Sequence, residues 1–177
     1  MVDARDVWAD PKQAARWSAD PARGNPTRVE HLDLMLDLIE TLYRPGAAML
    51  DIGIGSGLVE AQLFARLPEA RVVGLDGSPA MVALAEQRLK PHAARVRIVM
   101  DELTDPDAGA VPGGPFQIAF SVQTIHNVPD AAKVHTLRRV FDALEPGGWF
   151  LLVVIRGPPT EALFPAYRLA WDRLNRL

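Results

Sequence analysis

Short apolar runs alternate with segments of helical periodicity along most of this chain. Five runs are almost continuously apolar: Ala48–Ile54, Arg71–Leu75, Val96–Met100, Phe116–Val122 and Trp149–Ile155. Strands that are buried on both faces show continuous apolar positions, whereas half-exposed strands alternate apolar and polar residues. The pattern therefore predicts a parallel sheet with a layer of helices on each face.

Segments with apolar residues at helical spacing separate most of these runs. The clearest are Leu58–Leu67, Pro79–Lys90 and Asp130–Leu144. Ser78 is a typical N-cap for the second, and Pro146-Gly147-Gly148 ends the third. On the third we expect the apolar stripe to face the core: Val134, Leu137, Phe141 and Leu144. Alternation of strand and helix predicts βαβ units with right-handed crossovers, which is an α/β fold.

A further helix is predicted before the first strand. Asn25 is a good N-cap and Pro26 fits the first helical position, so we place the start there. Apolar residues then recur at helical spacing until Pro45-Gly46: Val29, Leu32, Leu36, Ile39 and Tyr43. Residues 1–25 contain Trp8 and Trp17 but show no lasting period. We expect a loosely helical arm there, either a lid over a site or ordinary packing, and one domain over residues 26–177.

Composition narrows the classes of function. The chain has 177 residues, of which 49% are hydrophobic and 23% charged, which fits one folded domain. Its net charge of −3 provides no basic field for nucleic acid. It has no cysteine, and the four histidines show no metal-ligand spacing, so we expect no metal site. No apolar run approaches the ~20 residues of a membrane span, and we expect a cytoplasmic protein that binds a small molecule.

A glycine-rich turn follows the first predicted strand. The sequence DIGIGSG places glycines at positions 53, 55 and 57, where they let the backbone turn tightly and approach a ligand. Their G-x-G-x-G spacing differs from the G-x-G-x-x-G of dinucleotide folds, and Asp51 adds an acid inside the strand. Both features disfavour a nicotinamide-dependent oxidoreductase.

Acidic residues end the next two predicted strands. Asp76 follows the glycines by about 20 residues, where a carboxylate can accept hydrogen bonds from the ribose hydroxyls of a nucleoside. Asp101 and Glu102 end the third strand, and a carboxylate there could accept a hydrogen bond from the amine of adenine. Each acid alone could equally be a turn former or a helix cap. Together with the glycine turn, they predict a nucleoside site at the carboxyl edge of the sheet.

At these residues the chain resembles the class I S-adenosylmethionine-dependent methyltransferases of the small-molecule type, over about residues 27 to 156. The resemblance is carried by MLDIGIGSG, VVGLDGSPAMVALAEQRL, VRIVMDEL, FQIAFSVQTIHNVPD and LRRVFDALEPGGWFLLVV. It implies a Rossmann-like sheet with strand order 3-2-1-4-5. It also implies that S-adenosylmethionine lies across the strand ends and leaves as S-adenosylhomocysteine.

The resemblance also implies functions for single residues. Asp51, Gly53, Gly55 and Gly57 would line the methionine side of the cofactor. Asp76 would hold the ribose, and Gly77 and Met81 belong to the same motif, with Met81 beside the adenine. Asp101 would face the adenine amine with Glu102 next to it. Ser121 and Gln123 would approach the methionine moiety and the reacting methyl group.

His126, just beyond the fourth predicted strand, is the one candidate for a general base. An imidazole near its ordinary pKa can take a proton from a hydroxyl or amine acceptor. The alternative is a loop histidine with no chemical role.

Two features depart from the family pattern. Gln117 stands where the family commonly has an acid after the aromatic residue that opens the fourth strand. The family sheet also continues into two further strands, whereas here one helical face follows the fifth strand: Leu163, Tyr167, Ala170, Trp171, Leu174 and Leu177. We therefore expect a truncated product, or a homodimer that covers the apolar edge of the fifth strand.

The sequence thus predicts methyl transfer from S-adenosylmethionine to oxygen, nitrogen or carbon of a small molecule by in-line displacement. The alternative is a non-catalytic cofactor-binding domain that has lost its acceptor site and acts as an interaction partner.

Overall fold

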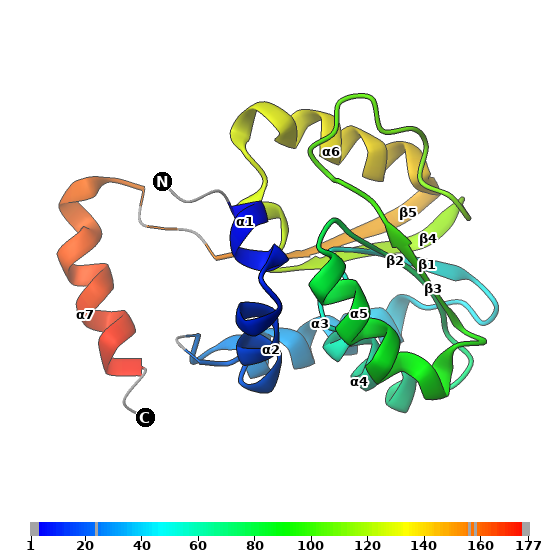
Figure 1. The fold of residues 1–177 in the computed structure, drawn as a ribbon, viewed down its shortest axis with the longest axis horizontal. Helices are drawn as coiled ribbons and strands as arrows, with labels where there is room; N and C mark the ends of the chain where they lie inside the picture. Colours follow the sequence, from blue (N-terminus) through cyan, green and yellow to red (C-terminus); the bar gives the residue numbers. More distant parts are fainter. Residues whose placement is uncertain (1–3, 24, 156, 158, 175–177) are drawn as a thin grey trace.

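Five parallel strands form one sheet in the order β3-β2-β1-β4-β5 (Figure 1). The computed structural model describes residues 4–23, 25–155, 157 and 159–174. The strands are β1 Ala48–Ile52, β2 Arg71–Asp76, β3 Val96–Met100, β4 Phe116–Val122 and β5 Leu144–Val153. The parallel sheet and its predicted strand order are confirmed. The last strand begins five residues earlier than predicted, with an irregular register opposite Phe116–Ile118.

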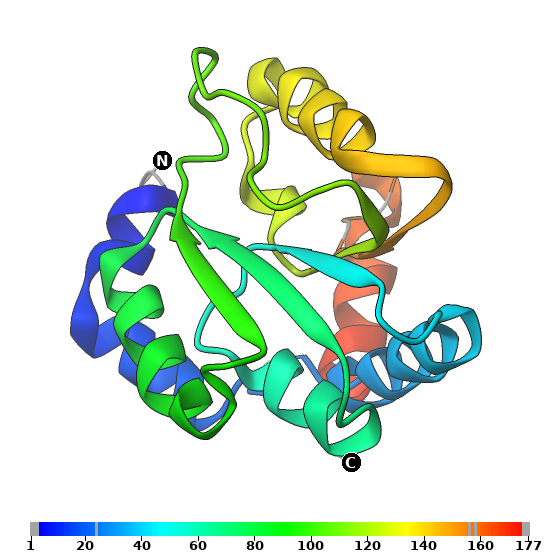
Figure 2. The ribbon, with the colours of Figure 1, turned by 90° about the vertical axis from the view of Figure 1, so that its right-hand side faces the viewer.

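Helices cover both faces of the sheet (Figures 1 and 2). One layer contains α3 Arg28–Leu42, α4 Leu58–Arg66 and α5 Pro79–Leu89, and the other contains α6 Asp130–Ala143. Successive residues of the central strands alternate between the two layers. Met49 belongs to the core under α3 and α4, while Leu50 belongs to the core under α6. The continuous apolar runs are explained by this double burial.

The helix starts follow local capping chemistry. Ser78 caps α5, because its hydroxyl accepts a hydrogen bond from the Met81 N–H at 3.2 Å, and Pro79 occupies the first turn, as predicted. The start predicted for α3 was wrong: the helix begins at Arg28 rather than at Asn25-Pro26. The Arg28 N–H donates to the carbonyl of Asn25 at 3.1 Å, so a separate turn precedes the helix.

The orientation predicted for α6 was also wrong. Three residues of the apolar stripe are exposed: Val134 (79%), Leu137 (38%) and Phe141 (68%). Thr136 and Val140 face the sheet instead. The Thr136 hydroxyl donates to the carbonyl of Leu103 at 2.8 Å, and Arg139 pairs with Asp101. These polar contacts with the segment after β3 orient the helix so that its apolar stripe faces away from the sheet.

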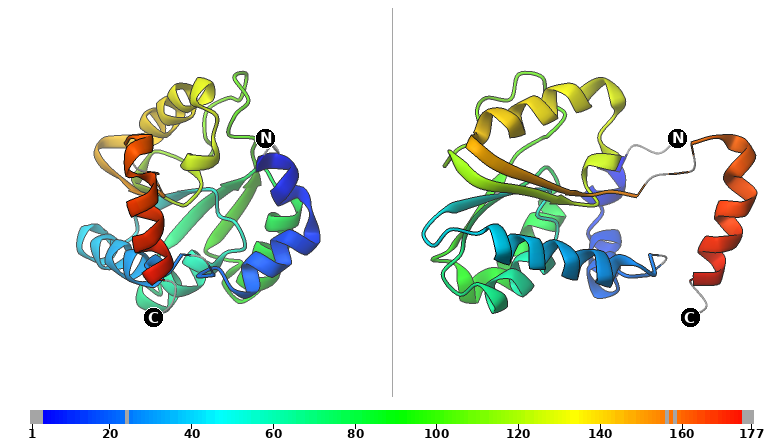
Figure 3. Two further views of the ribbon diagram at one scale, coloured as in Figure 1. Left: turned by 90° about the vertical axis from the view of Figure 1, so that its left-hand side faces the viewer. Right: turned by 180° about the vertical axis from the view of Figure 1, so that it is seen from behind.

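Both ends of the chain add helices outside the two layers (Figure 3). In the arm, α1 Ala4–Ala9 and α2 Pro11–Ala19 pack against α5. After η3 (Glu161–Leu163), α7 Phe164–Leu174 stands apart from the sheet and buries no side chain. Leu177, the last position of the predicted helical face, lies outside the described residues. Two further short 3₁₀ helices are η1 Lys90–His92 and η2 Ile125–Asn127.

The buried amide of Gln117 ties β4 to the end of α3. Its Nε2 donates to the carbonyl of Leu42 at 2.5 Å, and its Oε1 accepts from the N–H of Arg44 at 2.9 Å. One side chain thus satisfies a carbonyl that the helix end leaves open and an N–H of the turn that follows it. A carboxylate, which only accepts, cannot do both, and this explains why an amide suits this position.

We expect Gln117→Glu to lower the free energy of unfolding by about 1–3 kcal/mol, the cost of leaving a buried polar group without its partner. Urea unfolding at neutral pH measures the change. Gln62→Glu, at an exposed position of α4, makes the same chemical change and should be close to neutral. Equal losses in the two variants would contradict the assignment.

Candidate functional site

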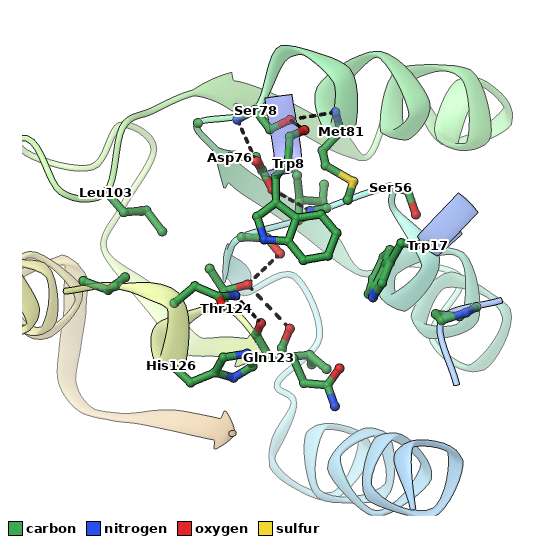
Figure 4. Close-up of a pocket in the computed structure, with 18 of the residues that line it drawn as sticks. Trp8, Trp17, Ser56, Asp76, Ser78, Met81, Leu103, Gln123, Thr124 and His126 are labelled. Carbon is green, nitrogen blue, oxygen red and sulfur yellow. Dashed lines mark hydrogen bonds between the residues drawn. The ribbon is translucent and has the colours of Figure 1, made fainter. Parts of the chain in front are cut away.

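A cavity of about 320 Å³ lies at the carboxyl ends of the strands (Figure 4). Its walls come from the turns after β1 and β2, the segments after β3 and β4, and the N-terminal arm. Eight predicted site residues line it: Gly53, Gly55, Asp76, Gly77, Met81, Glu102, Gln123 and His126. The other four do not: Asp51, Gly57, Asp101 and Ser121.

The glycine turn is shaped by close approaches on three sides. The N–H groups of Gly53 and Ile54 both donate to the carbonyl of Leu75, at 2.8 and 2.9 Å. Gly53 has a φ of +88°, and a Cβ there would lie 2.1 Å from the hydroxyl oxygen of Thr124. A Cβ on Gly55 would meet nothing closer than 3.9 Å, so this residue leaves open space at the cavity wall. Gly57 instead lies against Leu89 of α5 and has a packing role.

Asp76 presents an oriented carboxylate to the cavity. Its oxygens accept from the N–H groups of Gly55 at 2.8 Å and Ser78 at 2.9 Å. Burial raises the pKa of Asp76, these two hydrogen bonds oppose the rise, and the nearby charge of Glu102 adds to it. The Glu102 carboxylate lies over Gly77, where its Oε2 would be 3.2 Å from a Cβ. Two carboxylates therefore converge on one wall.

Asp101 is held away from the cavity. Arg139 of α6 donates to its two oxygens at 2.9 and 2.8 Å, and both side chains are largely buried. Hydrogen bonding to Asp101 raises the pKa of Arg139. Glu102 and Leu103, rather than Asp101, reach the cavity.

Asp51 and Glu60 form a buried acidic pair behind the glycine turn. Neither lines the cavity, and Asp51 Oδ1 and both Glu60 oxygens lack a hydrogen-bond donor. Burial raises the pKa of Asp51 well above its ordinary value, and the charge of Glu60 raises it further. Burial also raises the pKa of Glu60, against the opposing effect of a hydrogen bond with Asp51. The raised pKa values of both groups favour one proton shared between the two carboxyl groups, which would supply a donor that they lack.

The segment after β4 lines the cavity with Gln123, Thr124 and residues 126–129. Gln123 has a φ of +58°, an unusual conformation for a side chain other than glycine, and its N–H donates to the carbonyl of Val153 at 2.7 Å. Thr124 and His126 follow on the cavity wall. Burial lowers the pKa of His126, and the charge of Lys133 lowers it further, so the imidazole is neutral at neutral pH. Ser121 lies beneath them and donates to the carbonyl of Ile52 at 2.7 Å, which joins β4 to β1.

Six cavity residues from the first 28 positions were not predicted as site residues: Trp8, Trp17, Pro21, Arg23, Asn25 and Arg28. The indoles of Trp8 and Trp17 meet edge to face at 5.8 Å between centroids. The Ser78 hydroxyl donates to the carbonyl of Trp8 at 2.5 Å, which fastens the arm to the start of α5. Arg28 stacks over Trp17 and donates to the side-chain oxygen of Gln123. No motif in the sequence marks these residues, because each reaches the cavity through tertiary packing.

The fold and the site define a class. A parallel sheet of order 3-2-1-4-5, a G-x-G-x-G turn after β1 and an acid after β2 at the same cavity characterise a class I S-adenosylmethionine-dependent methyltransferase domain. Comparison with known proteins agrees: the family described as methyltransferase domain matches residues 49–148, and the chain belongs to this family.

Relatives with defined activities cover much of the chain. A ubiquinone biosynthesis O-methyltransferase of Xanthomonas euvesicatoria is 31% identical over 153 residues, which are 83% of this chain and 59% of that protein. A trans-aconitate 2-methyltransferase of Deinococcus radiodurans is 34% identical over 105 residues, which are 59% of this chain and 36% of that protein. The chain therefore spans about a third to three fifths of the length of these two relatives.

Solved structures share the fold. A methyltransferase of Geobacter sulfurreducens in complex with S-adenosylhomocysteine superposes with a TM-score of 0.62 at 23% identity, over 98% of this chain and 72% of that one. Within the described ranges, no helix is long and apolar enough to cross a membrane. The same residues contain no cluster of three or more histidine or acidic side chains that could hold a metal ion.

The buried acidic pair has a consequence for stability. The folded state keeps a proton that the unfolded chain releases near the ordinary carboxyl pKa of about 4, so the pair favours folding at low pH and opposes it as pH rises. We expect Glu60→Gln to raise the free energy of unfolding by about 1–4 kcal/mol at pH 8, because it replaces a buried acid by a neutral isostere.

Urea unfolding between about pH 5 and pH 8 tests this expectation. The variant should also lose part of the pH dependence that the parent protein shows over that range. Glu86→Gln, on the exposed face of α5, serves as the matched control and should leave the profile unchanged. Identical slopes for Glu60→Gln and the parent would refute the shared proton.

Proposed function

We propose that the protein transfers a methyl group from S-adenosylmethionine to an oxygen, nitrogen or carbon atom of a small molecule. The observation that carries the proposal is the Asp76 carboxylate, fixed by two backbone N–H groups directly beside the open glycine turn. Family membership supports it, since residues 49–148 match the methyltransferase domain.

The residues of the cavity fit this cofactor. Asp76 would accept hydrogen bonds from the ribose hydroxyls. Met81 and Leu103 offer apolar surface to the purine, and Glu102 lies at the same end. Gly55 has open space where a Cβ would point, which leaves room for the cofactor atoms that lead from the ribose to the sulfur. When bound, S-adenosylmethionine supplies an electrophilic methyl group on a sulfonium, with a neutral thioether as leaving group.

The residues after β4 would serve the acceptor. His126 has a buried Nδ1 without a hydrogen-bond partner, and its lowered pKa keeps it neutral and able to take a proton from a hydroxyl or amine. The main contribution of the protein is alignment of the acceptor, which is worth roughly 10⁵–10⁸ M in effective concentration. We propose that residues 1–25 act as a lid that excludes water, and that residues 26–177 form the cofactor-binding domain.

We also propose that two copies pair along β5. This strand lies at the end of the sheet and is bonded to β4 alone among the described strands. Trp149 is 51% exposed and Leu152 is 42% exposed. An apolar strand edge of this kind is a template for pairing with a second chain.

Calorimetry with S-adenosylhomocysteine tests the cofactor assignment. Asp76→Ala should weaken binding by about tenfold or more, because hydrogen bonds to a charged group contribute about 1.5–3 kcal/mol. Asp107→Ala, in the exposed loop after β3, is the control and should bind as the parent does. Binding of a nicotinamide dinucleotide without any response to S-adenosylhomocysteine would overturn the proposal.

Turnover is measured separately, with a labelled methyl donor and a metabolite extract. If His126 is the base, His126→Gln should incorporate less label than the parent protein. Its affinity for S-adenosylhomocysteine should stay the same. Full cofactor binding with no labelled product would instead favour the non-catalytic alternative.

Light scattering tests the pairing of β5. At micromolar concentration we expect a mass of about twice 19.4 kDa, and a single-copy mass for Trp149→Lys, because a charge on the edge opposes pairing. Leu34→Lys, at an exposed position of α3, is the matched control and should remain paired. A parent protein that runs as a monomer would rule out the dimer.

A further inference from the structure

We propose that α7 of one copy packs on the outward face of α6 of a second copy, so that the two chains exchange these helices. This inference deepens the proposed pairing along β5 and rests on it, because it names the surfaces that the two copies present to each other. Its basis is a pair of uncovered apolar surfaces that every copy carries.

The first surface is α7 itself. This 11-residue helix buries no side chain. Phe164 is 53% exposed and Leu169 is 67% exposed, while the rings of Tyr167 and Trp171 stack on each other at 6.1 Å between centroids. A short helix gains most of its stability in a protein from packing of an apolar face. A helix that buries nothing in its own chain therefore needs a surface elsewhere.

The second surface is the outward stripe of α6, which consists of Val134, Leu137 and Phe141. These residues lie on one face of the helix, and Val134 and Phe141 are 79% and 68% exposed. The opposite face is held to the segment after β3 by the Thr136 hydroxyl and by the guanidinium of Arg139. The helix cannot turn its stripe toward the sheet without breaking these contacts, so the stripe has to be covered from outside.

Within one chain, α7 and the Phe141 end of this stripe lie at opposite ends of β5. Phe141 precedes the first residue of β5, Leu144, by less than one helical turn. In contrast, α7 stands beyond the carboxyl end of the strand, at which the chain leaves the sheet (Figures 1 and 3). The position of α7 therefore favours contact with another copy over contact with its own α6.

A two-fold axis between paired β5 strands brings the two surfaces together. Two copies of one edge strand related by such an axis run antiparallel, so the carboxyl end of each strand lies beside the amino end of the other. Each α7 follows a carboxyl end and thus reaches the Phe141 end of the stripe on the second copy. The contact forms twice and covers both surfaces with groups that each chain itself carries.

Cross-linking of introduced cysteines tests the exchange. The chain has no cysteine, so a bismaleimide joins introduced thiols alone. An affinity-tagged Phe141→Cys chain is mixed with an untagged Leu169→Cys chain, and we expect a covalent dimer with one chain of each kind. The double variant Phe141→Cys/Leu169→Cys should also give covalent dimers. Leu34→Cys, at a 59% exposed position of α3, replaces Phe141→Cys in the matched control and should give no product with Leu169→Cys.

Two results of this experiment would overturn the exchange. A double variant that cross-links within one chain and keeps a monomer mass would show that α7 folds back on its own α6. Absence of any product that joins positions 141 and 169 would show that something other than α7 covers the stripe.

Mixing of charge variants gives an independent readout by light scattering over a concentration series. Phe141→Lys and Leu169→Lys should each weaken self-association by about tenfold or more, because each removes a large apolar side chain from both contacts. An equimolar mixture should associate more tightly than either variant alone, since one chain keeps its α7 and the other keeps its stripe. Unchanged association of both variants, or no rescue on mixing, would refute the exchange.

The outcomes separate this inference from the proposals on which it rests. A paired parent protein without a cross-link between positions 141 and 169 would remove only the exchange, and pairing through β5 would stand. A monomeric parent would remove the pairing and the exchange together. Neither result bears on the cofactor: Phe141 and Leu169 do not line the cavity, and both lysine variants should bind S-adenosylhomocysteine as the parent does.

Discussion

The contact between the glycine turn after β1 and Thr124 after β4 is the constraint on which the cavity depends. In the order β3-β2-β1-β4-β5, the chain leaves β1 toward one side of the sheet and β4 toward the other. The two loops diverge from this point, and ligands of open α/β sheets bind in the resulting crevice. Gly53 lets the turns touch, because any Cβ there would overlap the side chain of Thr124. The crevice is therefore closed at its base and open above Gly55.

Charged groups are buried around this point rather than within the apolar cores. Asp51 and Glu60 lie behind the turn, Arg139 and Asp101 hold α6 to the end of β3, and Arg28 lies at the arm. Only the Arg139 pair balances its own charge. The raised pKa values of the acidic pair and the lowered pKa of Arg28 have the same largest cause, which is burial of a charge. Such imbalance is typical of functional sites, where stability is given up for a pre-oriented polar surface.

Sequence pattern predicted the sheet and eight of the residues that line the cavity, because most of those residues follow strand ends that parallel pairing brings together. It could not predict how α6 is oriented. Helical spacing shows that Val134 and Phe141 share a face but not which face meets the sheet. That choice depends on the pair Arg139 and Asp101, which are 38 positions apart. The same pair removes Asp101 from the cavity. Arg28 and Asn25 escaped prediction for a related reason: a helix start gives no signal of what it faces.

The cavity is lined partly by residues within the stretch that matches the family and partly by residues that precede it. Asp76, Glu102 and Gln123 lie within residues 49–148, which match the family, whereas Trp8, Trp17, Asn25 and Arg28 precede them. Three side-chain contacts join the arm and the start of α3 to the stretch that matches the family: Ser78 to Trp8, Arg88 to Ser18 and Arg28 to Gln123. A ligand that bridges Asp76 and Arg28 would touch both parts at once. If the arm acts as the proposed lid, such a ligand would hold it in place, so that binding of the ligand and exclusion of water would depend on the same segment.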